Sequence, residues 1–95
     1  MEYSFEREMT ISHSEFFRIL PKALKSYPYK VKDKLVIVTL DGGEISIILS
    51  EQRRRQIASL SLPVTGVTFH LKDVAESTKM IFFEQFDRAY HRGGG

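Results

Sequence analysis

The chain has 95 residues, which is enough for one domain with a single core and a single site. Hydrophobic residues make up 42% and charged residues 27%, the balance of an ordinary globular protein, so disorder is excluded for most of the length. Cysteine is absent, which excludes disulfides, a thiolate nucleophile and cysteine-ligated zinc sites.

The net charge is small. Lysine and arginine number 14 against 12 aspartates and glutamates, a formal charge of +2, which is low for a strong nucleic-acid binder. No apolar stretch reaches the length of about 20 residues that a membrane-spanning helix needs. The first residues, Met-Glu-Tyr-Ser-Phe-Glu, have neither the basic nor the apolar region of a signal peptide. We therefore expect a cytoplasmic protein that does not bind membranes.

The first segment alternates between apolar and polar residues, which predicts a strand with one solvated face. Arg7 stands at a position where the alternation predicts an apolar residue, so this part of the strand is expected near a sheet edge. Ser12 and Glu15 then have the spacing of a capping box, and apolar residues at helical spacing predict a helix over residues 13–26. Pro21 lies inside this helix and is expected to kink or restart it.

The middle of the chain is typical of strands. Residues 29–40 are extended, as one strand or as two, and the turn Asp41-Gly42-Gly43 leads into an alternating segment over residues 45–49. After the charged residues 51–55, in which a short helical turn could form, alternation predicts a strand over residues 58–62. A turn is predicted at residues 63–66 and a further strand at residues 67–72.

A broad apolar face predicts a last helix over about residues 74–91, ended by Gly93. The predicted order is β-α-β-β-β-β-α with about five strands, an α+β fold in which consecutive strands form an antiparallel meander. Both helices have one aromatic-rich face, so both should cover the same face of the sheet. This element order resembles the helix-grip and TATA-binding-protein-like architectures, and the resemblance implies a fold but no function. Residues 1–92 are expected to form one domain and residues 93–95 a flexible glycine tail.

Basic residues form the first candidate site, for nucleic acid or another anion. A stripe on the first helix and the segment after it carry Arg18, Lys22, Lys25, Lys30 and Lys32, and a later run consists of Arg53, Arg54 and Arg55. Guanidinium groups bind phosphate and carboxylate through paired donors. The alternative for each group is an ordinary solvated surface, and if the arginine run is extended, Arg54 points away from its two neighbours.

The sheet face away from the helices is the second candidate. It is expected to carry a set of hydroxyl-bearing and mixed side chains, namely Ser46, Ile48, Ser59, Ser61, Thr68 and His70. Such a face is either solvated or covered by a second copy or a partner.

The end of the chain, Arg92-Gly93-Gly94-Gly95, is the third candidate. It resembles the tail of ubiquitin-like sulfur carriers, which implies that Gly94 and Gly95 would enter an activating enzyme. Those carriers have a β-grasp fold and a tail that follows a strand, whereas this tail is predicted to follow a helix.

No nucleophile–base arrangement and no phosphate-binding glycine loop is present in the sequence, and Glu84, Asp87 and His91 are only a weak match to a metal site. We expect no cofactor and no bound metal, and we favour a protein that is not an enzyme. The first hypothesis is a small binding module that acts on a protein partner, or on a second copy, through its open sheet face or its basic surface. A nucleic-acid- or anion-binding regulator and a sulfur-carrier-like protein are the alternatives.

Overall fold

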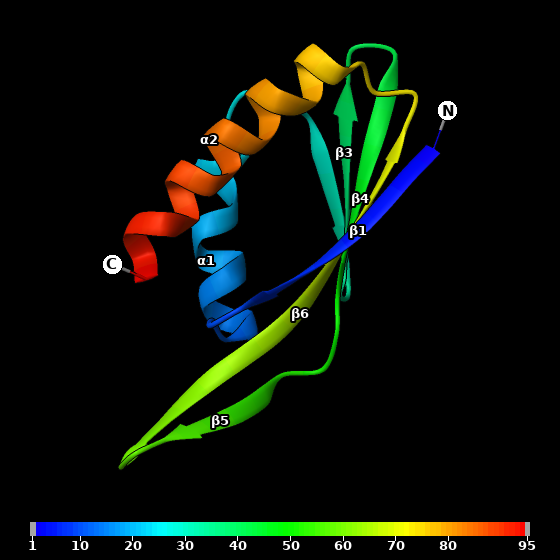
Figure 1. Ribbon diagram of the computed structural model, residues 1–95. Coiled ribbons are helices and arrows are strands. Elements are labelled where there is room, and N and C mark those ends of the chain that lie inside the picture. Colours follow the sequence, from blue (N-terminus) through cyan, green and yellow to red (C-terminus); the bar gives the residue numbers. More distant parts are fainter. Residues whose placement is uncertain (1, 95) are drawn as a thin grey trace.

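The structure, a computed structural model, describes residues 2–94, with side chains as far as His91. It has the α+β fold that the sequence predicts, an antiparallel sheet with two helices (Figure 1). In chain order the elements are β1 (Glu2–Met9), α1 (His13–Ala23), β2 (Tyr29–Lys32), β3 (Leu35–Leu40), β4 (Gly43–Leu49), β5 (Arg53–Ile57), β6 (Leu60–Lys72) and α2 (Glu76–Gly94).

The strand order across the sheet is β1-β6-β4-β3-β2, and β5 pairs with β6 beyond the edge of this path. All pairs are antiparallel. Residues 29–40, for which one strand or two were open, are two strands, because Asp33 takes a positive φ of 57° in the turn between them. The sheet therefore has six strands.

The predicted meander is correct only for β2, β3 and β4, because β4 pairs with β6 and not with β5. The strand predicted over 58–62 is correct for residues 60–62, which begin β6, but it is not a separate strand. The turn predicted over 63–66 is wrong, and among the charged residues the chain forms β5 and not a helical turn. The chain turns instead at Ala58, whose φ is 54°, and β6 then runs without a break through Pro63 and Gly66. Proline, which has no backbone N–H group, fits there because it lies opposite Arg54 in a two-stranded segment. No strand within residues 2–94 pairs with the outer edge of this segment.

A β-bulge separates the sheet from the hairpin of β5 and the first part of β6, which we call the arm. Leu49 pairs with Val67 and Arg53 pairs with Val64, so Ser50, Glu51 and Gln52 stand opposite only two residues of β6. An extra residue of this kind bends the strand and increases its twist. The arm accordingly projects away from the helices (Figure 1), and the molecule measures 47 × 22 × 22 Å.

The core lies between the sheet and the two helices. The sheet contributes alternate residues of its three central strands, namely Val36, Val38, Leu40, Ile45, Ile47, Leu49, Val67, Phe69 and Leu71. Both helices contribute to the same cluster, and Figure 1 shows both on one side of the sheet. Neither of the two helices in the described part of the chain covers the other face of the sheet.

Helix α1 begins as predicted, since the Ser12 hydroxyl accepts a hydrogen bond from the Glu15 N–H at 3.1 Å. It runs through Pro21 as one helix and ends at Ala23, so the predicted restart does not occur and the helix is shorter than expected. Tyr90 of α2 joins the two helices by donating its hydroxyl hydrogen to the Phe16 carbonyl at 2.8 Å. Burial raises the pKa of Tyr90, so this hydroxyl stays protonated and remains a donor.

Candidate functional site

The uncovered face of the sheet, called the open face below, consists of side chains in rows that cross five strands. The strand registers define two central rows. The first row contains Ser4, His70, Ser46, Ile37 and Lys30, and the second contains Glu6, Thr68, Ile48, Leu35 and Lys32. Charge therefore changes across the face, from the acidic strand β1 through a neutral centre to the lysines of β2.

Four of the six residues predicted for the partner face do lie together on the open face. Ser46 is opposite His70, and Ile48 is opposite Thr68. Ile48 is the most exposed of them at 45%, while the other three are half-buried. Ser59 and Ser61 do not belong to this group. They lie on the arm, because residues 58–62 form its turn and the start of β6 and not a strand of the main sheet.

On the β1 side of the open face, polar side chains join β1 to β6. Ser4 Oγ lies 2.6 Å from His70 Nδ1, and Glu2 Oε1 lies 3.2 Å from His70 Nε2. This is a serine, a histidine and a carboxylate in contact, the three groups used in nucleophilic catalysis. Their side chains are exposed on a flat strand surface, with 40% of His70 and 58% of Glu2 accessible. Because these side chains are solvent-accessible and join directly opposed strands, we interpret the contacts as cross-strand pairing.

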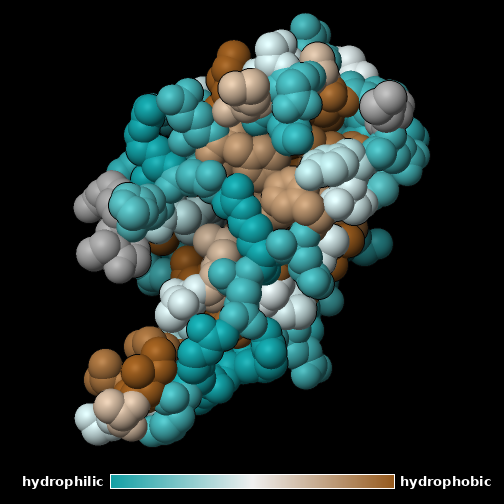
Figure 2. Space-filling view, in the orientation of Figure 1, coloured by the Kyte–Doolittle hydropathy of each residue, from teal (hydrophilic) through white to brown (hydrophobic). Residues whose placement is uncertain are grey.

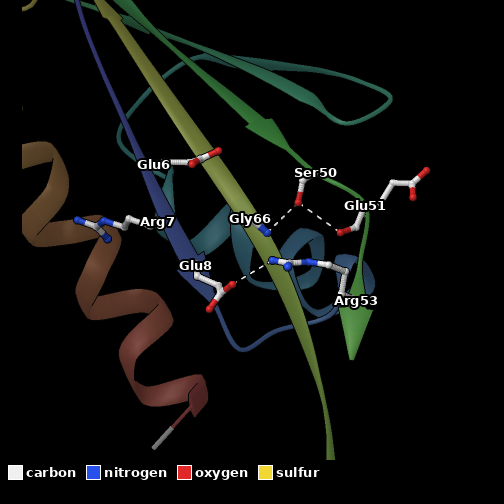
Figure 3. A pocket seen from close by; sticks show the side chains of 7 residues that line it. All are labelled: Glu6, Arg7, Glu8, Ser50, Glu51, Arg53 and Gly66. Atoms are coloured by element: carbon white, nitrogen blue, oxygen red, sulfur yellow. Dashed lines mark hydrogen bonds and ion pairs between the residues drawn. The ribbon is translucent and has the colours of Figure 1, made fainter. Parts of the chain in front are cut away.

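A hollow of about 660 Å³ lies where the arm leaves the sheet (Figure 3). Gly66 forms its floor, and its N–H and carbonyl groups both bond to Ser50, at 2.9 Å to the hydroxyl and at 2.8 Å to the N–H. Figure 3 shows Glu8 and Arg53 meeting across the hollow, while Arg7 points away toward α2. Arg7 there pairs with Asp87 and lies over three phenylalanine rings, which explains its place on the apolar parity of β1.

Glu8 is the anchor of the arm. Its carboxylate bonds to Arg53 at 3.0 Å and also to Arg55, while Arg54 points the other way and donates to the Ser61 hydroxyl at 2.8 Å. The alternation predicted for an extended arginine run is thus seen in the contacts. Hydrogen bonds from Arg55 and then Arg53 hold the pKa of Glu8 below its ordinary value of 4.5.

The lowered pKa gives a first prediction. At a pH above the ordinary glutamate pKa of 4.5, Glu8 is a carboxylate and its ion pairs stabilise the arm. This stabilisation is lost as the pH falls through the lowered pKa of Glu8. In a carbon-13 NMR titration, the midpoint of Glu8 should therefore lie below the ordinary glutamate value of 4.5. Arg55→Gln should raise the Glu8 midpoint, whereas Arg54→Gln, a matched change on the other side of β5, should not. Equal midpoints in both variants would show that the Arg55 contact does not form in solution.

The predicted basic residues do not form one surface. Arg18 and Lys22 are exposed on α1, Lys25 is exposed in the turn that follows it, and Arg18 pairs with Glu15. Lys30 and Lys32 lie on the open face at the β2 edge, and the arginines lie on the arm, which extends β6 near the opposite edge. The structure thus joins only the two β2 lysines to the predicted partner face. The glutamates of β1 were not among the predicted site residues, although their shared parity is visible in the sequence.

At the end of the chain, α2 extends through Gly93 to Gly94, one residue past the predicted stop. Gly95 lies outside the described residues, so the tail hypothesis stays a prediction.

Membrane-spanning helices and metal-binding clusters are both absent from the described part of the chain. Within residues 2–94, no helix combines the length and the hydropathy needed to cross a bilayer. In the same part of the chain, no three acidic or histidine side chains stand close enough together to hold a metal ion; Asp87 and Glu84 instead contact Arg7 and Arg88.

Comparison of the chain with family models, with curated proteins and with solved structures gave no match. Its function must therefore be argued from its own surfaces.

Proposed function

We propose that this protein is a small cytoplasmic binding module that engages a protein partner through the open face of its sheet. The observation that carries the proposal is the neutral centre of that face. Ser46, Ile48, Thr68 and His70 form a contiguous patch that neither helix covers. The patch has no lysine, arginine, aspartate or glutamate, and charged residues are depleted at the centres of protein interfaces.

The charges on either side of the patch support a directional contact. Glu2 and Glu6 lie on β1, and Lys30 and Lys32 lie at the opposite edge on β2. A partner with the reverse arrangement of charges would bind in one orientation, since like charges placed opposite each other are unfavourable.

Binding of nucleic acid or another polyanion is a weaker candidate. Arg53 and Arg55 already share the Glu8 carboxylate, and the α1 stripe and the β2 lysines lie on different layers. Titration of single-stranded DNA and RNA in about 50 mM salt tests it, because phosphate contacts make affinity fall steeply with added salt.

The second prediction tests the open face. Ile48→Glu should weaken partner binding at least about tenfold, because the change places a charge in the centre of the contact. Ile81→Glu is the matched control, since Ile81 is also exposed, at 60%, but lies on α2. The tagged wild-type protein and both variants are each incubated with an extract of the cells in which the protein occurs naturally. The proteins that are recovered with each of the three are then compared.

The proposal requires a protein that is recovered with the wild type and the Ile81 variant and is lost with the Ile48 variant. Recovery that is equal in all three would contradict it, provided that circular dichroism shows all three to be folded.

A further inference from the structure

We propose that the outer edge of β1 receives an extended segment of another protein as an additional strand, and that this segment alternates apolar and basic side chains. This site is separate from the centre of the open face. It depends on the backbone of β1, the groove beside α2 and the glutamates of β1.

The backbone of β1 offers the hydrogen-bonding edge. β1 is the first strand in the sheet order and has 8 residues. Gly66 directs its N–H and carbonyl groups to Ser50, on the β4 side, as the other even-numbered residues of β6 do. The odd-numbered residues of β6 therefore direct their N–H and carbonyl groups to β1. Their partners on β1 are the odd-numbered residues. The even-numbered residues of β1 therefore turn their N–H and carbonyl groups outward, where the described part of the chain supplies no strand.

A groove beside this edge offers room for apolar side chains. It encloses about 230 Å³ between β1 and α2 and is lined by Tyr3, Phe5, Arg7, Lys79, Met80 and Phe83. Figure 2 shows the apolar colouring between these two elements. Tyr3 and Met80 remain 51% and 64% exposed. An edge strand beside a helix, with an apolar groove between them, is the arrangement in which extended peptides add to a sheet.

The charges on the other side of β1 specify the alternate positions of the bound segment. Glu2, Ser4, Glu6 and Glu8 all direct their side chains to the open face. Glu8 is held by two arginines, but Glu6 has only a 3.4 Å contact from the Thr68 hydroxyl, and Glu2 contacts His70. A strand beside β1 would place its own side chains directly opposite these carboxylates, where lysine or arginine is favourable.

A second copy of this chain fits the edge less well than a different protein. Two β1 edges that pair antiparallel would place glutamates opposite one another, which is unfavourable. The other edge strand, Tyr29-Lys30-Val31-Lys32, has the alternating pattern, but pairing it with β1 would join copies head to tail, into a ring or an open filament. The alternation of apolar and basic residues in β2 illustrates the kind of segment that the β1 edge would bind. We propose that a different protein supplies this segment.

The test uses synthetic peptides of the length of β1, 8 residues, with blocked ends. The probe alternates valine and lysine; one control has four valines followed by four lysines, and another alternates valine and glutamate. The alternating valine–lysine peptide should bind at least about tenfold more tightly than either control, which corresponds to about 1.4 kcal/mol. In NMR spectra, the amides of Ser4 and Glu6 should shift and exchange more slowly with solvent.

Two variants distinguish binding at the β1 edge from binding elsewhere on the protein. Met80→Glu should weaken binding of the valine–lysine peptide at least about fivefold, because it charges the groove, whereas Ile81→Glu, next to it but outside the groove lining, should not. Ile48→Glu should also leave peptide binding unchanged, so failure of the open-face proposal does not affect this one. Several outcomes would overturn the inference: equal binding of all peptides, no change with Met80→Glu, or head-to-tail self-association that blocks the edge.

Discussion

Phe86→Ala is expected to lower the free energy of unfolding by about 3–5 kcal/mol, the usual cost of emptying a buried phenylalanine site. Phe86 is fully buried, and its ring lies within 6.5 Å, centroid to centroid, of five other aromatic rings. These rings come from α1, β6 and α2, so the change would loosen the contact of both helices with the sheet. Urea denaturation followed by circular dichroism measures the loss.

The control for this prediction is Met80→Ala on the same helix, where the side chain is 64% exposed. An exposed change of this kind normally alters stability by less than about 0.5 kcal/mol. If Phe86→Ala also costs less than about 1 kcal/mol, Phe86 is not in the core and the helix placement is wrong.

Gly43→Ala is expected to have a similarly large effect, about 3 kcal/mol or more, for a different reason. A Cβ atom at Gly43 would lie 2.2 Å from the Asp73 carbonyl oxygen and 2.4 Å from the Lys72 carbonyl oxygen. Both are backbone atoms, so no side-chain rotation can relieve the contact. The melting temperature should fall steeply, because one kcal/mol corresponds to about 4–8 °C in a domain of 60–100 residues.

Gly42→Ala is the matched control in the same turn. Gly42 has a φ of +81° but no atom within 4 Å of the added Cβ, so only backbone strain of about 1–2 kcal/mol is expected. If the two variants are equally stable, the end of β6 does not pass as close to Gly43 as the structure indicates.

The parts of the fold that were predictable are those with a local signal. The hairpin at Asp41-Gly42, the Ser12 cap and the apolar faces of both helices follow from turn chemistry and periodicity, and all are present. The path around residues 50–66 was not predictable in this way. Ala58 carries no marker of a positive φ, and Pro63 and Gly66 are typical of a turn although both lie within β6. Their place depends on pairing with strands that are distant in sequence.

The same distinction applies to the candidate site. Alternation correctly placed Ser46, Ile48, Thr68 and His70 on one face, because a strand's two faces can be distinguished from its own sequence. Which strands are neighbours cannot be determined from alternation alone. The proximity of Lys30 to Ser46 through Ile37, and of Glu8 to Arg53, depends on strand order. The sequence did place the first strand near an edge, because of Arg7, and β1 is an edge strand, but which strands lie beside its glutamates was identified only from the structure.

The bulge at Ser50–Gln52 reverses the relation between odd or even residue number and the face on which a side chain lies. In β4 the odd-numbered residues point into the core, and Ile47 lies opposite Phe69. Beyond the bulge the odd-numbered residues lie on the other side, where Arg53 and Arg55 reach Glu8 on the open face. Deleting Glu51 would make the register with β6 continuous, with Arg53 still opposite Val64 and on the same face. It would remove the bend that the bulge introduces, so the arm would continue more nearly in line with the sheet. The loss of this one residue would therefore change the direction of the arm, whereas substitution of a single arginine would change only the contacts that this side chain makes.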